Sequence, residues 1–140
     1  MPASYRIHAD ARFVYTQAAG ILTGREMVAH ARALADDPAF APTYAQLADF
    51  RTTTAFDATS TDMRLLADRN PFDPKARRVA LVCTSLAFGM LRMYQLISGI
   101  DEGASLVTRS DVDAWTFLGL SPAVVERAAA SVWTSDAAAT

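Results

Sequence analysis

The stretch YAQLADFRTTTAFDATSTDMRLLA, Tyr44 to Ala67, contains a predicted strand, a loop and a helix in succession. The alternating pattern of Tyr44–Phe50 indicates a strand. The Thr-rich segment Arg51–Thr59 is predicted as a loop, and a helix is predicted from about Thr61 to Arg69. Strand, loop and helix in this order are typical of an α/β unit, and further units of this kind are expected in the rest of the chain.

The sequence that follows repeats this alternation. RRVALVCTS, Arg77–Ser85, is a nearly continuous apolar run, as expected for a strand buried on both faces. SLAFGMLRMYQLISG, Ser85–Gly99, is predicted as a helix, with Ser85 as its N-cap and Gly99 just past its end. The remaining predicted elements are a strand at Ala104–Arg109, a short helix capped by Ser110 and a terminal helix capped by Ser121.

The N-terminal part supplies two strands and one helix. Aromatic and β-branched residues predict strands at Tyr5–His8 and Arg12–Ala18, a pair that Gly20 closes. Thr23 and Glu26 match the capping box that begins a helix. Strands that alternate with helices predict one α/β domain with a mixed, mostly parallel sheet. We assign residues 1–120 to this domain and residues 121–140 to an extra C-terminal helix and a frayed tail.

Composition excludes several classes of protein. The 140 residues are 51% hydrophobic, which is enough for a single packed core. The net charge of −2 gives no general nucleic-acid footprint. Cys83 is the only cysteine, so neither an intramolecular disulfide nor a cysteine-based metal site is expected. No signal peptide or membrane-spanning segment is predicted, and the expectation is a cytoplasmic protein without a cofactor.

No catalytic signature is present. There is no serine on a Gly-flanked elbow and no phosphate-binding loop, so a non-enzymatic protein is predicted. His8 and His30 have no ligands at metal-binding spacing and are interpreted as structural or solvent-facing. The basic cluster of Lys75, Arg77 and Arg78 is interpreted as a solvated connection between a helix and a strand.

Hydroxyl groups gather where two predicted strands end. In open α/β sheets ligands bind beyond the carboxyl ends of the strands, and hydroxyls beside an arginine and two helix N-termini suit an anion. The alternative is that these hydroxyls cap helices or bond to their own loop. The candidate residues are Arg51, Thr52, Thr53, Thr54, Thr59, Ser60, Thr84 and Ser85.

The predicted helix Ser85–Gly99 is apolar on nearly every side, whereas a surface helix should keep one polar face. Its outer side therefore needs a cover, which is either the C-terminal helix or a second subunit in a homodimer. The candidate interface residues are Phe88, Leu91, Arg92 and Gln95.

The order of elements and several short motifs resemble the anti-sigma-factor-antagonist (STAS) domains, in the SpoIIAA-like, STAS/SEC14 branch. The resemblance runs from about Tyr5 to Leu118. It rests on YAQLADFR as the third strand, the FD that follows, a hydroxyl at the next helix start, and FDPKARRVALV leading into the fourth strand. ILTGREM and DDPAF match the segment between the second and third strands.

This resemblance implies a mixed sheet backed by helices on one side, and a non-enzymatic regulatory or protein-interaction module. In the antagonist proteins a Ser or Thr at the start of the second helix is phosphorylated. The matching residue here is Thr59 or Ser60, preceded by Asp57. The SEC14 side of the branch implies the alternative, a protein that binds a small apolar ligand or lipid.

Overall fold

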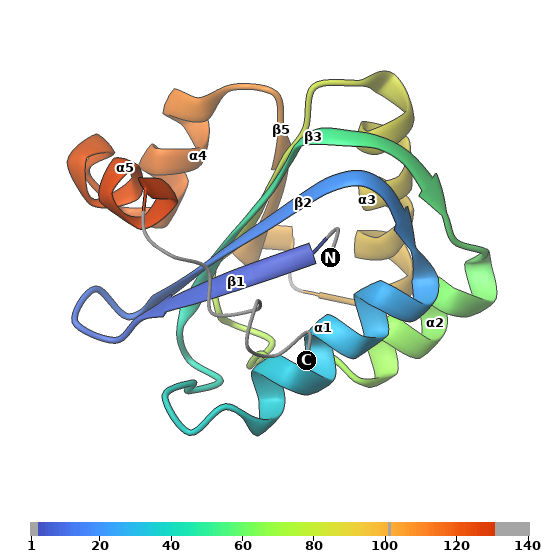
Figure 1. Cartoon of the computed structure of the whole chain (residues 1–140), viewed down its shortest axis with the longest axis horizontal. Coiled ribbons are helices and arrows are strands. Elements are labelled where there is room, and N and C mark those ends of the chain that lie inside the picture. Colours follow the sequence, from blue (N-terminus) through green and yellow to red (C-terminus); the bar gives the residue numbers. More distant parts are fainter. Residues whose placement is uncertain (1–2, 101, 131–140) are drawn as a thin grey trace.

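The structure is a computed structural model that describes residues 3–100 and 102–130. Its centre is a five-stranded sheet in the order β1-β2-β3-β4-β5 (Figure 1). β1 is antiparallel to β2, and every other neighbouring pair is parallel, so the predicted mixed and mostly parallel sheet is confirmed. The strands are β1 (Ala3–His8), β2 (Phe13–Thr23), β3 (Ala45–Asp57), β4 (Arg78–Leu81) and β5 (Ser105–Thr108).

Helices cover both faces of this sheet. One hydrophobic cluster joins the sheet to α1, α2 and α3, and another joins the opposite face to α4 and α5 (Figure 1). The expectation of helices on one side is therefore wrong. The reason lies in the strands: Val79 and Leu81 of β4 face α4, while Ala80 faces the other side, and each apolar face needs a cover. The helices are α1 (Gly24–Asp36), α2 (Ser60–Asp68), α3 (Ser85–Ser98), α4 (Asp111–Leu118) and α5 (Pro122–Ala130), with a short 3-10 turn η1 (Glu102–Ala104).

β2 and β3 are both longer than predicted. The parallel ladder between them continues from Ala19–Thr52 to Thr23–Asp57, so most of the predicted loop Arg51–Thr59 is strand. Gly20 does not close the first pair of strands, because it lies within β2 at a register shift with a φ of 67°. That left-handed backbone is easy for glycine and lets the long strand bend without breaking the ladder.

Local capping signals set the helix starts. The predicted capping box of Thr23 and Glu26 is present at α1. At α2 the N-cap is Thr59, one of the hydroxyl residues that the sequence offered as caps. At α3 the N-cap is Thr84, one residue before the predicted Ser85. In each case the threonine side chain accepts a hydrogen bond from a backbone N–H of the first turn, which is the contact that defines an N-cap.

The C-terminal helix α5 packs on the face opposite α3. Val125 and Ala128 are buried against Phe13 and α4. The described part of α5 therefore does not cover α3, contrary to one of the two covers that the sequence left open (Figure 1). The predicted frayed tail lies outside the described residues. No helix in residues 3–100 and 102–130 is long and apolar enough to cross a membrane.

Candidate functional site

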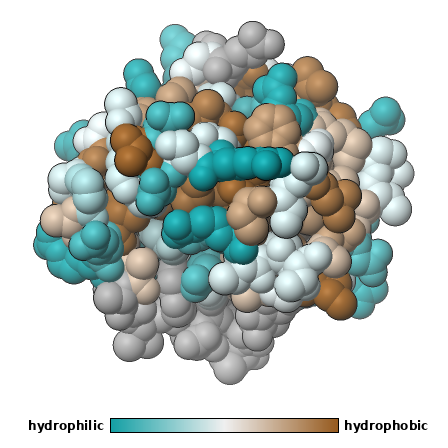
Figure 2. Space-filling view, turned by 90° about the horizontal axis from the view of Figure 1, so that it is seen from above, coloured by the Kyte–Doolittle hydropathy of each residue, from teal (hydrophilic) through white to brown (hydrophobic). Residues whose placement is uncertain are grey.

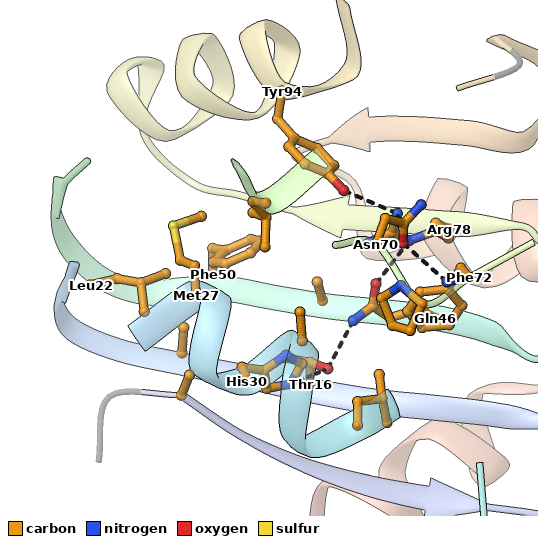
Figure 3. Close-up of a pocket in the computed structure, with 17 residues that line it drawn as sticks. Thr16, Leu22, Met27, His30, Gln46, Phe50, Asn70, Phe72, Arg78 and Tyr94 are labelled. Carbon is orange, nitrogen blue, oxygen red and sulfur yellow. Dashed lines mark hydrogen bonds between the residues drawn. The ribbon is translucent and has the colours of Figure 1, made fainter. Parts of the chain in front are cut away.

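A cavity of about 80 Å³ lies between the sheet and helices α1, α2 and α3. One end is apolar, where Leu22, Met27 and Phe50 gather (Figure 3). At the other end Arg78 lies beside Asn70, among polar and aromatic side chains (Figure 3). The pocket is therefore amphipathic, with separate places for an apolar group and for a polar one.

A chain of hydrogen bonds crosses the pocket from α1 to β4. His30 Nε2 lies 3.2 Å from Thr16 Oγ1, which accepts a hydrogen bond of 3.0 Å from Gln46 Nε2. Arg78 Nε donates to Gln46 Oε1 at 3.1 Å. Because a guanidinium can only donate, Arg78 orients the Gln46 amide and thereby the Thr16 hydroxyl (Figure 3).

Arg78 is surrounded by neutral groups. Its Nη1 donates to Asn70 Oδ1 at 3.2 Å and to the Tyr94 hydroxyl at 3.4 Å. Its guanidinium carbon lies 4.5 Å from the centre of the Phe72 ring, a cation–π contact that keeps the guanidinium over the ring. Within the described residues no carboxylate forms an ion pair with Arg78.

Strand register explains how these residues meet. Gln46 is the direct partner of Arg78 in the β3–β4 ladder, and Thr16 projects from the same face of β2. The interpretation of the basic cluster as solvated holds for the exposed Lys75 and Arg77 and is wrong for Arg78. A signal was present in the sequence: Arg78 has the same parity as Ala80 and Val82 in a strand that is buried on both faces.

His30 is a neutral base inside this arrangement. Burial, and then the positive charge of Arg78, lower the pKa of His30 to about 4. The His30 and Tyr5 rings are perpendicular, with their centroids 5.5 Å apart. The structural interpretation of His30 from the sequence is compatible with these contacts, but its place in the pocket was not foreseen.

Acidification should destabilise the fold through His30. Its pKa is lower in the folded chain than in the unfolded chain, where it is near 6.5, so the unfolded chain binds more protons between those values. Stability should therefore fall as pH drops from about 6.5 towards 4, by on the order of 2 kcal/mol from this residue. Urea unfolding at several pH values would measure the change.

His30→Gln is the matched variant, because glutamine can still bond to Thr16 but does not titrate. Its stability should depend less on pH than that of the parent. His8, whose pKa burial and Arg6 also lower, contributes equally to both proteins and cancels in the difference. An unchanged pH dependence in His30→Gln would contradict the assignment.

The predicted anion site at the sheet edge has a different arrangement. Arg51 forms a two-pronged ion pair with Asp49, with Nε–Oδ1 at 3.0 Å and Nη2–Oδ2 at 2.8 Å. Thr52 Oγ1 and Thr53 Oγ1 both donate to the carbonyl of Ala18 at 3.0 Å. The charge of Arg51 is thus already compensated, and two of the hydroxyls tie β3 to β2.

The remaining edge residues fall into two groups. Thr84 caps α3 and Ser85 Oγ accepts from Arg109, beside the connection from β4 to α3. Asp57, Thr59 and Ser60 lie at the far end of β3, about 20 Å along the strand from Arg51 at the usual rise per residue. The structure does not bring these groups together, because the segment predicted to fold back as a loop is an extended strand. Thr54 and Ser60 are exposed.

Seen from above, the side that carries the connections into α3 and α4 has hydrophilic side chains interleaved with apolar ones (Figures 1 and 2). Among the coloured residues of this view, hydrophilic and hydrophobic side chains are mixed, so hydropathy does not mark a site there. The cavity between the sheet and helices α1, α2 and α3 is therefore the better candidate for a functional site.

The interface predicted on α3 is partly excluded. Leu91 is buried against the sheet, so it cannot contact a second subunit. Phe88 is partly exposed, Arg92 donates to Gln95 at 2.6 Å, and Gln95 donates to Ser105 at 2.8 Å. A dimer through the outer side of α3 stays a prediction.

In the described part of the chain, no group of three His, Cys, Asp or Glu side chains could hold a metal ion.

Comparison with known proteins identifies the fold. No family model matches the chain, and no curated protein matches it. A crystal structure of an uncharacterized protein of the DUF3478 family from Shewanella loihica PV-4, described as having a SpoIIAA-like fold, is similar to it, with a TM-score of 0.54 and 17% sequence identity. The match covers 83% of this chain and 91% of that one. The chain therefore has a SpoIIAA-like fold, and the resemblance seen in the sequence is confirmed at that level.

Proposed function

We propose that this chain is a non-enzymatic, STAS-type module that binds a small, mostly apolar molecule in the pocket beneath α1, α2 and α3. The observation that carries the proposal is the amphipathic cavity, which has a preformed polar chain at one end and an apolar wall at the other. Ligand sites commonly have this form: a mostly apolar concavity with a few polar groups that orient the ligand.

The pocket offers little for catalysis. Among its described lining residues there is no Asp, Glu, Cys, Ser or Lys. His30 is linked to Thr16, but no acid orients its ring or receives a proton from it within the lining. Binding without chemical conversion is the simplest use of such a site.

The regulatory role implied by the STAS resemblance is compatible with ligand binding. Ser60 is exposed at the first position of α2, where the helix dipole favours a phosphate. α2 also contributes Leu66 to the pocket wall. Phosphorylation of Ser60 stays a prediction, and the pocket is the feature from which we argue function.

A homologous series of small amphiphiles tests the proposal. Straight-chain alcohols and carboxylates of two to eight carbons are titrated into labelled protein and followed by amide NMR. We expect saturable shifts at the lining residues, and affinity should rise about fourfold per methylene, or ~0.8 kcal/mol, until the cavity is filled.

A pair of variants locates the site. Ala48 lines the pocket, whereas Ala19 on β2 is exposed and does not, so Ala48→Leu should weaken binding and Ala19→Leu should leave it nearly unchanged. If neither alcohols nor carboxylates of any length give saturable shifts at the lining residues, the proposed function is wrong.

A further inference from the structure

We infer that the ligand of this pocket is a short-chain monocarboxylate whose carboxylate group binds the guanidinium of Arg78. This rests on the proposed function and names the chemical class of the ligand.

The positive charge of the pocket favours an anionic ligand. Arg78 is the only residue of the described lining that carries a charge at neutral pH, because His30 is neutral there. Its hydrogen-bond acceptors, from Gln46, Asn70 and Tyr94, are all uncharged. A cation that is partly removed from water and has no anionic partner is unfavourable, so an anion that enters beside it gains more than a neutral group of the same size.

Arg78 can donate further hydrogen bonds to a ligand. Nε and Nη1 have partners, whereas Nη2 has no hydrogen-bond partner among the described residues and is not sealed from solvent. One carboxylate oxygen can accept from Nη2. The other can replace the Tyr94 hydroxyl, whose 3.4 Å contact with Nη1 is the longest of the three. A planar guanidinium suits a planar carboxylate bound in this two-pronged way.

Arg51 already forms a two-pronged pair of this kind with a carboxylate of the same chain. Its Nε and Nη2 hold the two oxygens of Asp49 at 3.0 and 2.8 Å. Arg78 has no such internal carboxylate in the described residues. An external carboxylate would supply at Arg78 what Asp49 supplies at Arg51.

The size and shape of the cavity limit the rest of the ligand. Leu22, Met27 and Phe50 form the end away from Arg78, so an alkyl chain fits there better than a second polar group (Figure 3). A cavity of about 150 Å³ accommodates benzene, and this cavity of about 80 Å³ is roughly half that size, so it suits a short chain of no more than about four carbons. One positive charge also balances one negative charge, which favours a monocarboxylate over a phosphate monoester.

Butyrate, 1-butanol and inorganic phosphate are the probes, titrated separately into the full chain by NMR. We expect butyrate to bind at least about tenfold more tightly than 1-butanol, because a charge-assisted pair replaces a neutral hydrogen bond. Phosphate should bind more weakly than butyrate, since it lacks the apolar part.

Arg78→Gln should abolish the preference, so that butyrate and 1-butanol bind with similar affinity. Arg77→Gln is the matched control: it removes the same charge from the neighbouring, exposed residue that lies over Phe117, and the preference should remain. The comparison of the three probes in the parent protein decides the inference even if Arg78→Gln does not fold.

Two results would overturn the carboxylate assignment. The first is equal affinity of the parent for butyrate and 1-butanol, and the second is phosphate binding as tight as that of butyrate. If 1-butanol still saturates the lining residues, the proposed function survives and only this inference fails. If no probe binds there, this inference is wrong, and the full series of alcohols and carboxylates decides the proposed function.

Discussion

Replacing Arg51 with methionine is expected to lower the free energy of unfolding by about 3 kcal/mol at neutral pH, because it leaves the buried carboxylate of Asp49 without its cation. Asp49 is only 5% exposed, and it accepts hydrogen bonds from Tyr15 Oη at 2.8 Å and from the Arg51 backbone and side chain. Breaking a buried ion pair costs about 3–5 kcal/mol of folding free energy. We expect the low end of this range because Asp49 keeps its hydrogen bonds from Tyr15 Oη and from the backbone N–H of residue 51.

The pH dependence of this loss identifies its cause. Burial by itself would raise the pKa of Asp49, but the hydrogen bonds from Arg51 and Tyr15 outweigh it, and the pKa is lowered. The parent therefore gains stability above the unfolded pKa of about 3.8 and loses it as pH falls through the lowered folded value. Arg51→Met removes the side-chain hydrogen bonds and the charge that lower the pKa of Asp49, so the difference between the two proteins should shrink at acid pH.

Urea unfolding of both proteins at pH 7 and pH 4 measures this difference. Arg92→Met is the control, since Arg92 is exposed and bonds only to Gln95 among the described residues, and it should change stability by less than about 0.5 kcal/mol. A deficit in Arg51→Met that is absent, or that is equal at both pH values, would contradict the role assigned to the pair.

Gly24→Ala is expected to destabilise the fold by about 2–4 kcal/mol, from overpacking and the loss of a helix cap. A Cβ at Gly24 would lie 2.7 Å from Asp62 Cβ and would overlap the Asp62 carboxyl group as well. That carboxyl accepts from the Thr59 backbone N–H at 2.9 Å as half of the capping box of α2. The added methyl group therefore has two effects: it strains the contact between α1 and α2, and it disrupts the capping box of α2.

A double-mutant cycle separates this clash from any general effect of alanine. Asp62→Ala alone should cost about 1 kcal/mol for the cap, and Gly24→Ala should cost less in that background than in the parent, because the carboxyl part of the clash is gone and only the contact with the Cβ at position 62 remains. Gly89→Ala in α3 is the control. Nothing lies within 4 Å of a Cβ there, so it should stabilise the helix by about 0.5–1 kcal/mol. Additive effects of Gly24→Ala and Asp62→Ala in thermal or urea unfolding would rule out the clash.

Local patterns in the sequence determine the order of the elements and most of their ends. The capping box of Thr23 and Glu26, the cap at Ser110 and the left-handed Gly99 after α3 are all present in the structure. Each depends on contacts within a few residues, so the local sequence contains the information that is needed. The N-cap of α3 is Thr84 and not the predicted Ser85, and that of α2 is Thr59 and not Ser60. In both cases the local sequence offers two adjacent hydroxyls of nearly equal capping preference.

The length of β3 depends on a partner far away in the chain. Thr52 and Thr53 could belong to a loop or a strand, and they become strand because β2 extends alongside and its Ala18 carbonyl accepts both hydroxyls. The same extension separates the residues that a loop would have brought together. Strand propensity is context-dependent, so no local pattern settles this.

The pocket, too, is decided only by tertiary structure. Its polar residues come from β2, α1, β3, the segment after α2, β4 and α3, and no two of them are near neighbours in the sequence. Arg51 and Arg78 both lie in strands, and their sequence contexts do not show which has a carboxylate partner. Asp49 and Arg51 lie two residues apart on one strand and pair with each other, whereas β3–β4 register turns Arg78 inward among neutral groups. Charge compensation depends on which side chains meet in space, so the sequence determines the frame and the tertiary fold decides which arginine is open to a ligand.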